Sequence, residues 1–204
     1  FDSVPDVLSQ LIRTAFIPSK GHRFIVSDFS AIEARVIAWL AGESWVIDTF
    51  KDHGKIYEMT ASRMFGVPME LIARGNPEYE LREKGKLATL ACGYQGSVGA
   101  LKAMGALNMG LEEEELPEIV AAWRKSNPNI VKLWWDVEDA AIRAVKNKAA
   151  VNMRYGLKFY YRSGVLFIRL PSGRSLAYVR PRIEIDTRFN KEKLTYEGIR
   201  VGNT

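Results

Sequence analysis

Residues 24–40 read Phe-Ile-Val-Ser-Asp-Phe-Ser-Ala-Ile-Glu-Ala-Arg-Val-Ile-Ala-Trp-Leu. The stretch begins with an apolar, β-branched run at 24–26, which is typical of a buried strand. Ile32, Val36 and Leu40 then recur at helical spacing, with alanines between them that keep the helix slim. Asp28 therefore falls where a strand is predicted to end and a helix to begin.

This position gives Asp28 two possible roles. A carboxylate at the end of a strand is held in place yet open to solvent, which suits Mg²⁺, because that ion keeps several waters and takes one or two protein carboxylates. Alternatively, Asp28 or Ser30 caps the start of the helix. The pattern by itself leaves both interpretations open.

A second stretch, about residues 78–95, is predicted to form a helix with a distinct stripe. Arg82, Lys86, Leu90 and Tyr94 are spaced by four residues and so follow one side of that helix. Two cations followed by an aromatic ring suit a nucleoside triphosphate, with charge for the phosphates and a ring for the base or sugar. Gly85 inside the helix costs about 1 kcal/mol relative to alanine, so we expect the helix to depend on tertiary packing.

Together the two stretches resemble motifs A and B of the family A DNA polymerases, the DNA polymerase I type, and are similar to phage and prophage members. The usual motif A is Asp-Tyr-Ser-Gln-Ile-Glu-Leu-Arg, and residues 28–35 read Asp-Phe-Ser-Ala-Ile-Glu-Ala-Arg. The usual motif B is Arg-x3-Lys-x3-Phe/Tyr-x3-Tyr-Gly, matched by Arg82, Lys86, Leu90 and Tyr94. Weaker similarity extends from about Leu11 to Tyr178.

The resemblance implies a role for most of these side chains. Asp28 would bind two Mg²⁺ ions, with the Phe29 carbonyl as a further ligand. Arg82 and Lys86 would hold the triphosphate, and Lys86 is also the candidate acid for the leaving pyrophosphate. Glu33 would crowd the sugar 2′ position and exclude ribonucleotides. The expected nucleotide-binding set comprises residues of both motifs: Ser30, Ile32, Glu33, Arg82, Lys86, Leu90 and Tyr94, the last beside the nascent base pair.

The sequence departs from the family pattern at three points. Leu90 stands where the family has an aromatic ring that contacts the incoming sugar, which puts discrimination against dideoxynucleotides in question. Ala31 replaces the usual glutamine and with it one contact on the minor-groove side. Motif C is a His-Asp dipeptide that carries the second metal carboxylate, and neither His22 nor His53 precedes an aspartate. We therefore expect a piece of a longer polymerase that is inactive on its own.

Charge divides the chain into two parts. Residues 1–142 hold 15 Lys and Arg against 20 Asp and Glu, whereas residues 143–204 hold 14 against 4. After Lys148 apolar and polar residues alternate, which predicts a β meander with basic residues on one face. Arg154, Lys158 and Arg174 are the expected DNA contacts, and Leu170–Arg174 is similar to a passage of the same family. Without the two motifs, a basic face that is merely solvated would be the favoured explanation of the charge.

Composition limits the other possibilities. No apolar run approaches the roughly 20 residues of a membrane span, so we expect no membrane contact. The single cysteine, Cys92, is expected to be a small core residue, and no Cys/His cluster predicts a zinc site. These features and the resemblance predict a monomeric protein of the cytoplasm, in a bacterial or phage-infected cell.

The predicted fold class is α+β, a partial polymerase palm with a small antiparallel sheet and a helical fingers subdomain. Residues 1–43 would form the palm part with motif A, 44–147 the helical fingers, and 148–204 the basic, β-rich return to the palm. Helices are expected at 4–17, at 44–65 with a break at 53–55, at 117–126 and at 130–147. Residues 183–204 are expected to form an exposed strand or hairpin.

The expected function is template-directed DNA synthesis: nucleotidyl transfer from a dNTP to the 3′ end of a primer, with primer-template DNA as partner. Two alternatives remain. The basic segment 143–204 would also suit a non-catalytic nucleic-acid-binding module, indifferent to dNTP and to Asp28. A metal-dependent nuclease would use Asp28 and Glu33 as metal carboxylates and would leave motif B unexplained.

Overall fold

The computed structural model describes residues 4–187 and 190–198. These residues fall into two compact units, which are divided between Ala31 and Ile32. In the first unit, α1 (Val4–Leu11) continues into a 3₁₀ turn at Ile12–Ala15, as the amphipathic spacing of 4–17 predicts. The chain then reverses at residues 19–22, where the amide of His22 donates to the carbonyl of Ser19 at 2.9 Å.

The predicted buried strand at residues 24–26 is wrong. Residues 22–29 lie in neither a helix nor a strand, and Ile25 and Val26 are 84% and 91% exposed. An apolar run becomes a buried strand only when another strand pairs with it. Among its described residues the first unit holds no second strand, so this run has no partner within its own unit.

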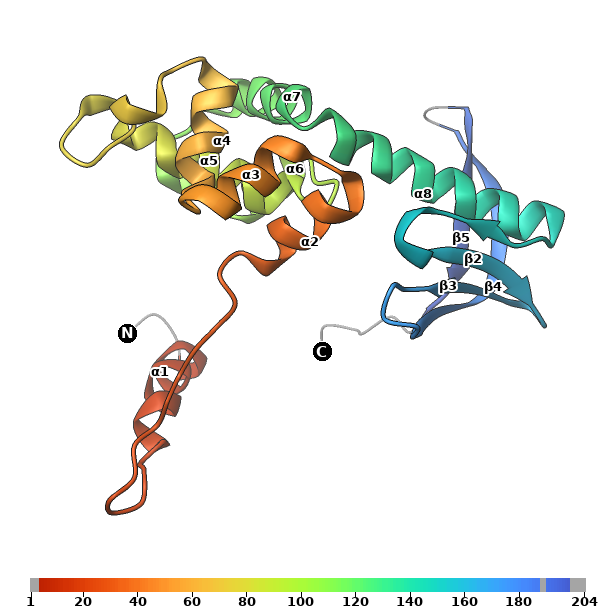
Figure 1. The fold of residues 1–204 in the computed structure, drawn as a ribbon, viewed down its shortest axis with the longest axis horizontal. Coiled ribbons are helices and arrows are strands. Elements are labelled where there is room, and N and C mark those ends of the chain that lie inside the picture. The colour runs from red at the N-terminus through yellow and green to blue at the C-terminus, as the bar shows by residue number, and fades with distance from the viewer. Residues whose placement is uncertain (1–3, 188–189, 199–204) are drawn as a thin grey trace. The chain divides into compact units, whose positions relative to one another are not determined.

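The second unit begins with the helix predicted from motif A. Helix α2 (Ile32–Ala41) is followed by Gly42, whose φ of +73° favours glycine. Helices α3 (Ser44–Asp52) and α4 (Ile56–Phe65) are separated at His53–Lys55, as predicted. The remaining helices are α5 (Leu81–Cys92), α6 (Val98–Ala103), α7 (Leu116–Ser126) and α8 (Pro128–Asn147). Figure 1 shows α3 to α7 grouped together and α8 extending from them to the sheet.

One core joins α5, α6, α7 and the first turn of α8. Its buried members include Leu87, Ala91 and Cys92 of α5, Leu101 of α6, Ile119, Val120 and Trp123 of α7, and Ile130 of α8. The carboxylate of Glu43 is buried at the start of α8, where it accepts the amides of Asn129 at 2.9 Å and Ile130 at 3.4 Å. It therefore satisfies amides that the first turn of a helix leaves unpaired.

The motif B helix is shorter than the predicted 78–95. A 3₁₀ turn at Pro77–Glu80 precedes α5, which ends at Cys92 and leaves Tyr94 outside the helix. The ending has a local cause, because Gln95 adopts a φ of +63°. Gly96 then approaches α5 so closely that a Cβ there would lie 2.1 Å from the carbonyl of Ala91.

The C-terminal part of the second unit is a five-stranded antiparallel meander in the order β1-β2-β3-β4-β5, which confirms the prediction. The strands are β1 (Val151–Asn152), β2 (Lys158–Arg162), β3 (Val165–Arg169), β4 (Ser175–Asp186) and β5 (Lys191–Glu197). The last two form the expected hairpin, although residues 199–204 lie outside the described chain. With its helices, the sheet makes this an α+β fold.

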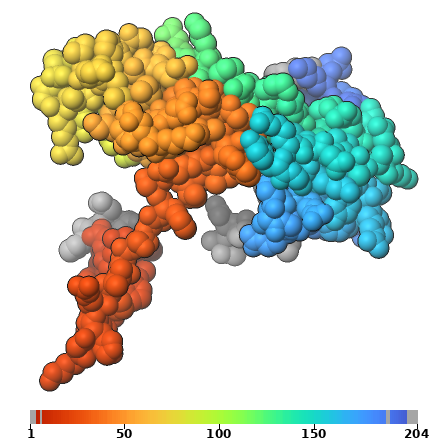
Figure 2. All heavy atoms as spheres, in the orientation of Figure 1, coloured from red at the N-terminus to blue at the C-terminus, as the bar shows by residue number. Residues whose placement is uncertain are grey.

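Helix α8 covers one face of the sheet. Phe159 of β2 and Leu166 of β3 are fully buried against Ala140, Ala141 and Ala144 of α8. Small alanines allow the helix to approach the strands closely. Figure 2 shows the atoms of α8 and of the sheet, green-teal to blue, packed against each other.

Candidate nucleotide-binding helix and nucleic-acid interface

Helix α5 has one buried side and one accessible edge. Its buried side packs against α4 and α7, and Gly85 is essential to that contact. A Cβ at Gly85 would lie 2.4 Å from the carbonyl of Tyr57 and 3.0 Å from the Cβ of Ala61, both on α4. The accessible edge therefore holds the sequence-predicted Arg82, Lys86 and Leu90, at the spacing expected for one helical side.

Arg82 is fixed by neighbours from three elements. Its Nε donates to Oε1 of Glu58 at 3.0 Å, and its Nη1 donates to Oε1 of Glu83 at 2.6 Å. The guanidinium lies 5.4 Å from the ring centroid of Tyr57 and 6.0 Å from that of Tyr79. Burial lowers the pKa of Arg82, but the hydrogen bond and charge of Glu58 outweigh that effect and raise it. Arg82 is thus a positioned, permanent cation.

Lys86 lies one turn beyond Arg82 and shares a carboxylate with it. The Nζ atom of Lys86 is 3.7 Å from Oε2 of Glu83, so Glu83 stands between the two cations. Lys86 and Glu83 are both close to half exposed, and a solvent-accessible pair of this kind is weak. An incoming polyphosphate could displace Glu83 and bind both cations.

Beyond these cations the accessible edge becomes apolar. Leu90 is exposed at the end of α5, and Tyr94 is 73% exposed in the turn that follows. The structure brings Tyr57 to Arg82 and places Glu83 between Arg82 and Lys86, and Leu90 and Tyr94 lie further along the same segment. Sequence reasoning missed the ion-pair partners Glu58 and Glu83. No helical spacing rule indicates Glu58, because it lies on α4 and not on α5.

The motif A residues are divided between the two units. Asp28, Phe29 and Ser30 belong to residues 1–31, whereas Ile32 and Glu33 form the first turn of α2. Asp28 is exposed, and its Oδ1 accepts the amide of Phe29 at 2.8 Å. Ser30, Ile32 and Glu33 are also exposed.

Only part of a metal site can be assigned to these residues. The described ranges contain no group of three or more His, Cys, Asp or Glu residues that could hold a metal ion. One exposed carboxylate, Asp28, and the adjacent carbonyl of Phe29 are nevertheless hard oxygen donors of the kind that Mg²⁺ takes in small number. These donors fit part of the protein share of a magnesium site, which needs further ligands to be complete.

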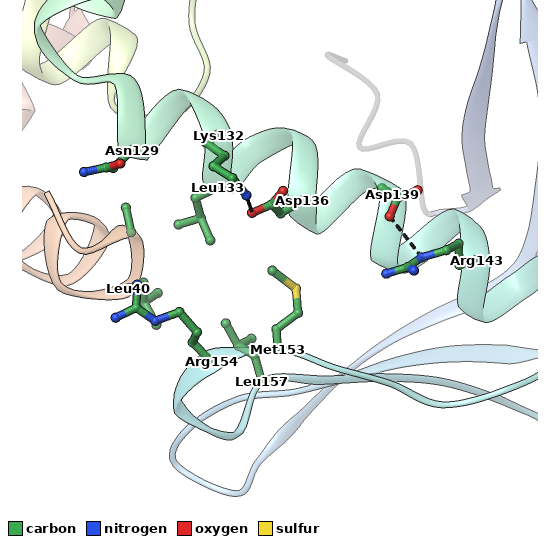
Figure 3. A pocket seen from close by; sticks show the side chains of 11 residues that line it. Leu40, Asn129, Lys132, Leu133, Asp136, Asp139, Arg143, Met153, Arg154 and Leu157 are labelled. Atoms are coloured by element: carbon green, nitrogen blue, oxygen red, sulfur yellow. Dashed lines mark hydrogen bonds and ion pairs between the residues drawn. The ribbon is translucent and has the colours of Figure 1, made fainter.

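Arg154 lies beside a pocket rather than on the sheet surface. The pocket, about 370 Å³, is formed by the end of α2, by α8 and by the 3₁₀ turn Arg154–Gly156. Figure 3 shows Arg154 reaching toward Leu40, with two ion pairs on the α8 side, Lys132–Asp136 and Arg143–Asp139. Arg154 also donates to the hydroxyl of Tyr155 at 3.2 Å. Both carboxylates of the pocket are already paired.

Lys158 and Arg174 lie on and beside the sheet. Lys158 begins β2, and Arg174 is exposed in the turn before β4. Sequence reasoning missed two further cations, Arg162 at the end of β2 and Arg169 at the end of β3. Two-residue alternation from Lys158 and the short turn at 163–164 could have placed both on the face of Lys158.

Comparison with known proteins assigns the chain to a family. The family described as DNA polymerase family A matches residues 3–162, which is well over half of the chain. The chain belongs to DNA polymerase family A. Both motifs, at residues 28–35 and 82–94, lie within the matched segment of this family A chain.

Several relatives are polymerases of phages and bacteria. The chain is 64% identical to a DNA polymerase of Bacillus phage SP02 over 198 residues, which is 97% of this chain and 30% of the relative. It is 32% identical to DNA polymerase I of Rhizobium leguminosarum over 151 residues, 74% of this chain and 14% of the relative. A thermostable DNA polymerase I of Thermus aquaticus is 45% identical over 65 residues, 32% of this chain and 8% of the relative.

The family A chain thus spans less than a third of these relatives. Family A DNA polymerases are nucleotidyltransferases and generally depend on metal ions. Of the helices that the structure describes, none is both long and apolar enough to cross a membrane.

Proposed function

We propose that this chain is the part of a family A DNA polymerase that carries motifs A and B. The parent protein would catalyse template-directed DNA synthesis, transferring a nucleotidyl group from a dNTP to the 3′ end of a primer. The family match across residues 3–162 is the observation that carries this proposal. The phage and bacterial sources of the relatives fit the expected setting, a bacterial or phage-infected cell.

In this proposal the edge of α5 binds the triphosphate of the dNTP. Arg82, held by Glu58, contributes a fixed charge, and Lys86 contributes a mobile one that exchanges Glu83 for phosphate oxygens. Lys86 would also donate a proton to the leaving pyrophosphate. Leu90 and Tyr94 would contact the sugar and the nascent base pair, where an apolar and an aromatic surface are exposed.

Motif A would hold the metal ions of the parent polymerase. Asp28 and the Phe29 carbonyl would bind Mg²⁺, which when bound stabilises negative charge on the attacking and leaving oxygens. Ser30, Ile32 and Glu33 would contact the sugar and phosphate side of the dNTP, with Glu33 excluding a 2′-hydroxyl. Such a site needs a further carboxylate, which we assign to motif C of the parent polymerase.

The remaining assignments concern DNA and subdomains. Primer-template DNA would contact Arg154, Lys158 and Arg174, all in the basic segment. Residues 44–147 would be the fingers, and residues 1–43 and 148–204 parts of the palm. A monomeric state remains a prediction.

The test compares two lysines of the same helix. In the full-length polymerase, Lys86→Gln should lower kcat/KM for single dNTP incorporation by about 10²-fold, because it removes a charge aimed at the phosphates. Lys84→Gln is the matched control, since Lys84 points away to Glu115, with Nζ and Oε1 3.4 Å apart. It should change kcat/KM by less than about threefold. Equal effects of both variants would contradict the proposal.

A further inference from the structure

The face of the sheet that is turned away from α8 combines basic and aromatic side chains. Along β2, Lys158, Tyr160 and Arg162 alternate with residues of the buried face, and their partners on β3 are Arg169, Phe167 and Val165. These six residues share one side, because paired residues in a sheet point the same way. We name them the sheet platform.

In the part of the chain that the structure describes, the three cations of the platform face no paired carboxylate. Within residues 4–187 and 190–198, Lys158, Arg162 and Arg169 make no ion pair and no side-chain hydrogen bond. Other cations of the same segment are paired: Lys146 with Glu192, and both Arg180 and Arg182 with Glu197. Lys158 also lies directly opposite Arg169. Like charges in that position destabilise a sheet unless an anion lies between or above them.

Between the cations lies an aromatic pair. The rings of Tyr160 and Phe167 are stacked, with centroids 5.2 Å apart and planes at 17°. Both residues are intermediate in burial, so part of each remains accessible. The next strand continues the apolar strip with Ala177 and Val179, which pair with Phe167 and Val165 and are exposed. Lys158 and Arg162 lie about 13 Å apart along β2, one at each end of the strip.

We propose that the sheet platform binds single-stranded nucleic acid. Bases would stack on Tyr160 and Phe167, while Lys158, Arg162 and Arg169 bind the phosphates at both ends of the strip. Charge complementarity selects a polyanion, and the accessible rings select a strand whose bases are not already stacked in a duplex. The proposal deepens the DNA contact proposed for Lys158, but it requires neither dNTP nor Asp28.

The experiment measures binding of a fluorescein-labelled dT 12-mer to the full-length protein by anisotropy, in EDTA and without dNTP, across a salt series. Lys158→Gln/Arg169→Gln should weaken binding at least tenfold at about 100 mM salt. It should also make the negative slope of the logarithm of the association constant against the logarithm of salt concentration shallower by about 1.4, because two phosphate contacts are lost. Tyr160→Leu/Phe167→Leu should weaken binding by about 5- to 100-fold with an unchanged slope, because it removes stacking and keeps apolar cover.

The control is Lys132→Gln/Arg143→Gln, which removes the same charge from paired positions on α8. It should leave the affinity within about twofold. Arg162→Gln gives an independent check if the aromatic variant unfolds, because this side chain is exposed and should also weaken binding.

Three results would overturn the proposal. The first is that the platform variants bind as tightly as the α8 control does. The second is that the aromatic variant weakens binding of a blunt duplex as much as that of the single strand. The third is that Arg162→Gln lowers the melting temperature without altering affinity, which would mean that another part of the protein covers the face. Single-nucleotide incorporation on a template with a one-base overhang distinguishes a failure of the platform proposal from a failure of the polymerase proposal. This incorporation depends on Lys86 and Asp28 and not on the sheet platform.

Discussion

The thiol of Cys92 lies on the buried side of α5, with no exposed surface. Burial raises its pKa to about 11, although the positive charge of Arg124 lowers it. At pH 8 only about one thiol in a thousand is then ionised in the folded chain. We expect Cys92 to react with a disulfide reagent at pH 8 only after unfolding in urea. Rapid reaction in the native state would contradict the buried position.

The same thiol makes stability depend on alkaline pH. The pKa is about 11 in the folded chain against 9.0 for an ordinary thiol. As pH rises, the thiol therefore loses its proton in the unfolded chain before it does so in the folded chain. The contribution of the neutral, buried thiol to the unfolding free energy is complete below pH 9 and is lost as pH rises to 11. Chemical denaturation of the wild type and of Cys92→Val should show a difference in unfolding free energy that changes by about 2 kcal/mol between pH 9 and pH 11. A constant difference would contradict the assignment.

Gly85 is required by packing. Replacing it with alanine should gain about 1 kcal/mol of helix propensity, but the new Cβ would lie 2.4 Å from a backbone carbonyl of α4. Backbone cannot move as a side-chain tip can, so we expect Gly85→Ala to lower the unfolding free energy by about 1–3 kcal/mol. Gly99→Ala is the control, since nothing lies within 4 Å of that Cβ in α6, and it should be neutral or stabilising. The melting temperatures of both variants check this.

For single residues, the sequence predicted the positions of the cations well and their ion-pair partners poorly. Spacing by four residues placed Arg82, Lys86 and Leu90 on one edge of α5, because helix geometry is local. The contact of Arg82 with Glu58 joins residues 24 positions apart, and only the packing of α4 on α5 creates it. The steric role of Gly85 was invisible for the same reason.

Among the helices and strands, α5 gives the most specific prediction about dNTP binding. Glu83 holds Arg82 and lies between it and Lys86, so it competes with any bound triphosphate. In the full-length polymerase we expect Glu83→Gln to lower the KM for dNTP about threefold at low salt, and less at high salt. Glu80→Gln, which removes the same charge from the preceding 3₁₀ turn, should leave KM unchanged. A raised KM in Glu83→Gln would mean that Glu83 positions the cations instead.

Helices and hairpins were predictable because their signals are local. The break at residues 53–55, the helix that follows motif A and the meander after Lys148 all follow from periodicity and turn residues. The apolar run at 24–26 failed as a strand, because a strand is stable only with a partner and its own unit offers none among the described residues. The end of α5 depended on Gln95 in a left-handed conformation, which its residue type does not predict.

For the whole molecule, the division into residues 1–31 and 32–204 falls inside motif A. Asp28 belongs to one unit, and Arg82 and Lys86 belong to the other. The fold class and the family were predictable from two ordered motifs, and the family match confirms the latter. The assembled catalytic site was not, because this chain spans 30% of the phage relative and the expected motif C carboxylate is not part of its sequence.

The most direct test of the polymerase assignment is primer extension by the full-length protein, wild type against Asp28→Asn, with DNA affinity measured in parallel. Asp48→Asn is the control, an exposed carboxylate of α3 changed in the same way. If Asp28 binds the catalytic metal, extension falls at least 10²-fold in Asp28→Asn alone while DNA affinity is unchanged. Unaltered extension in Asp28→Asn would show that motif A is misassigned, and no extension by the wild type would favour a non-catalytic nucleic-acid-binding module.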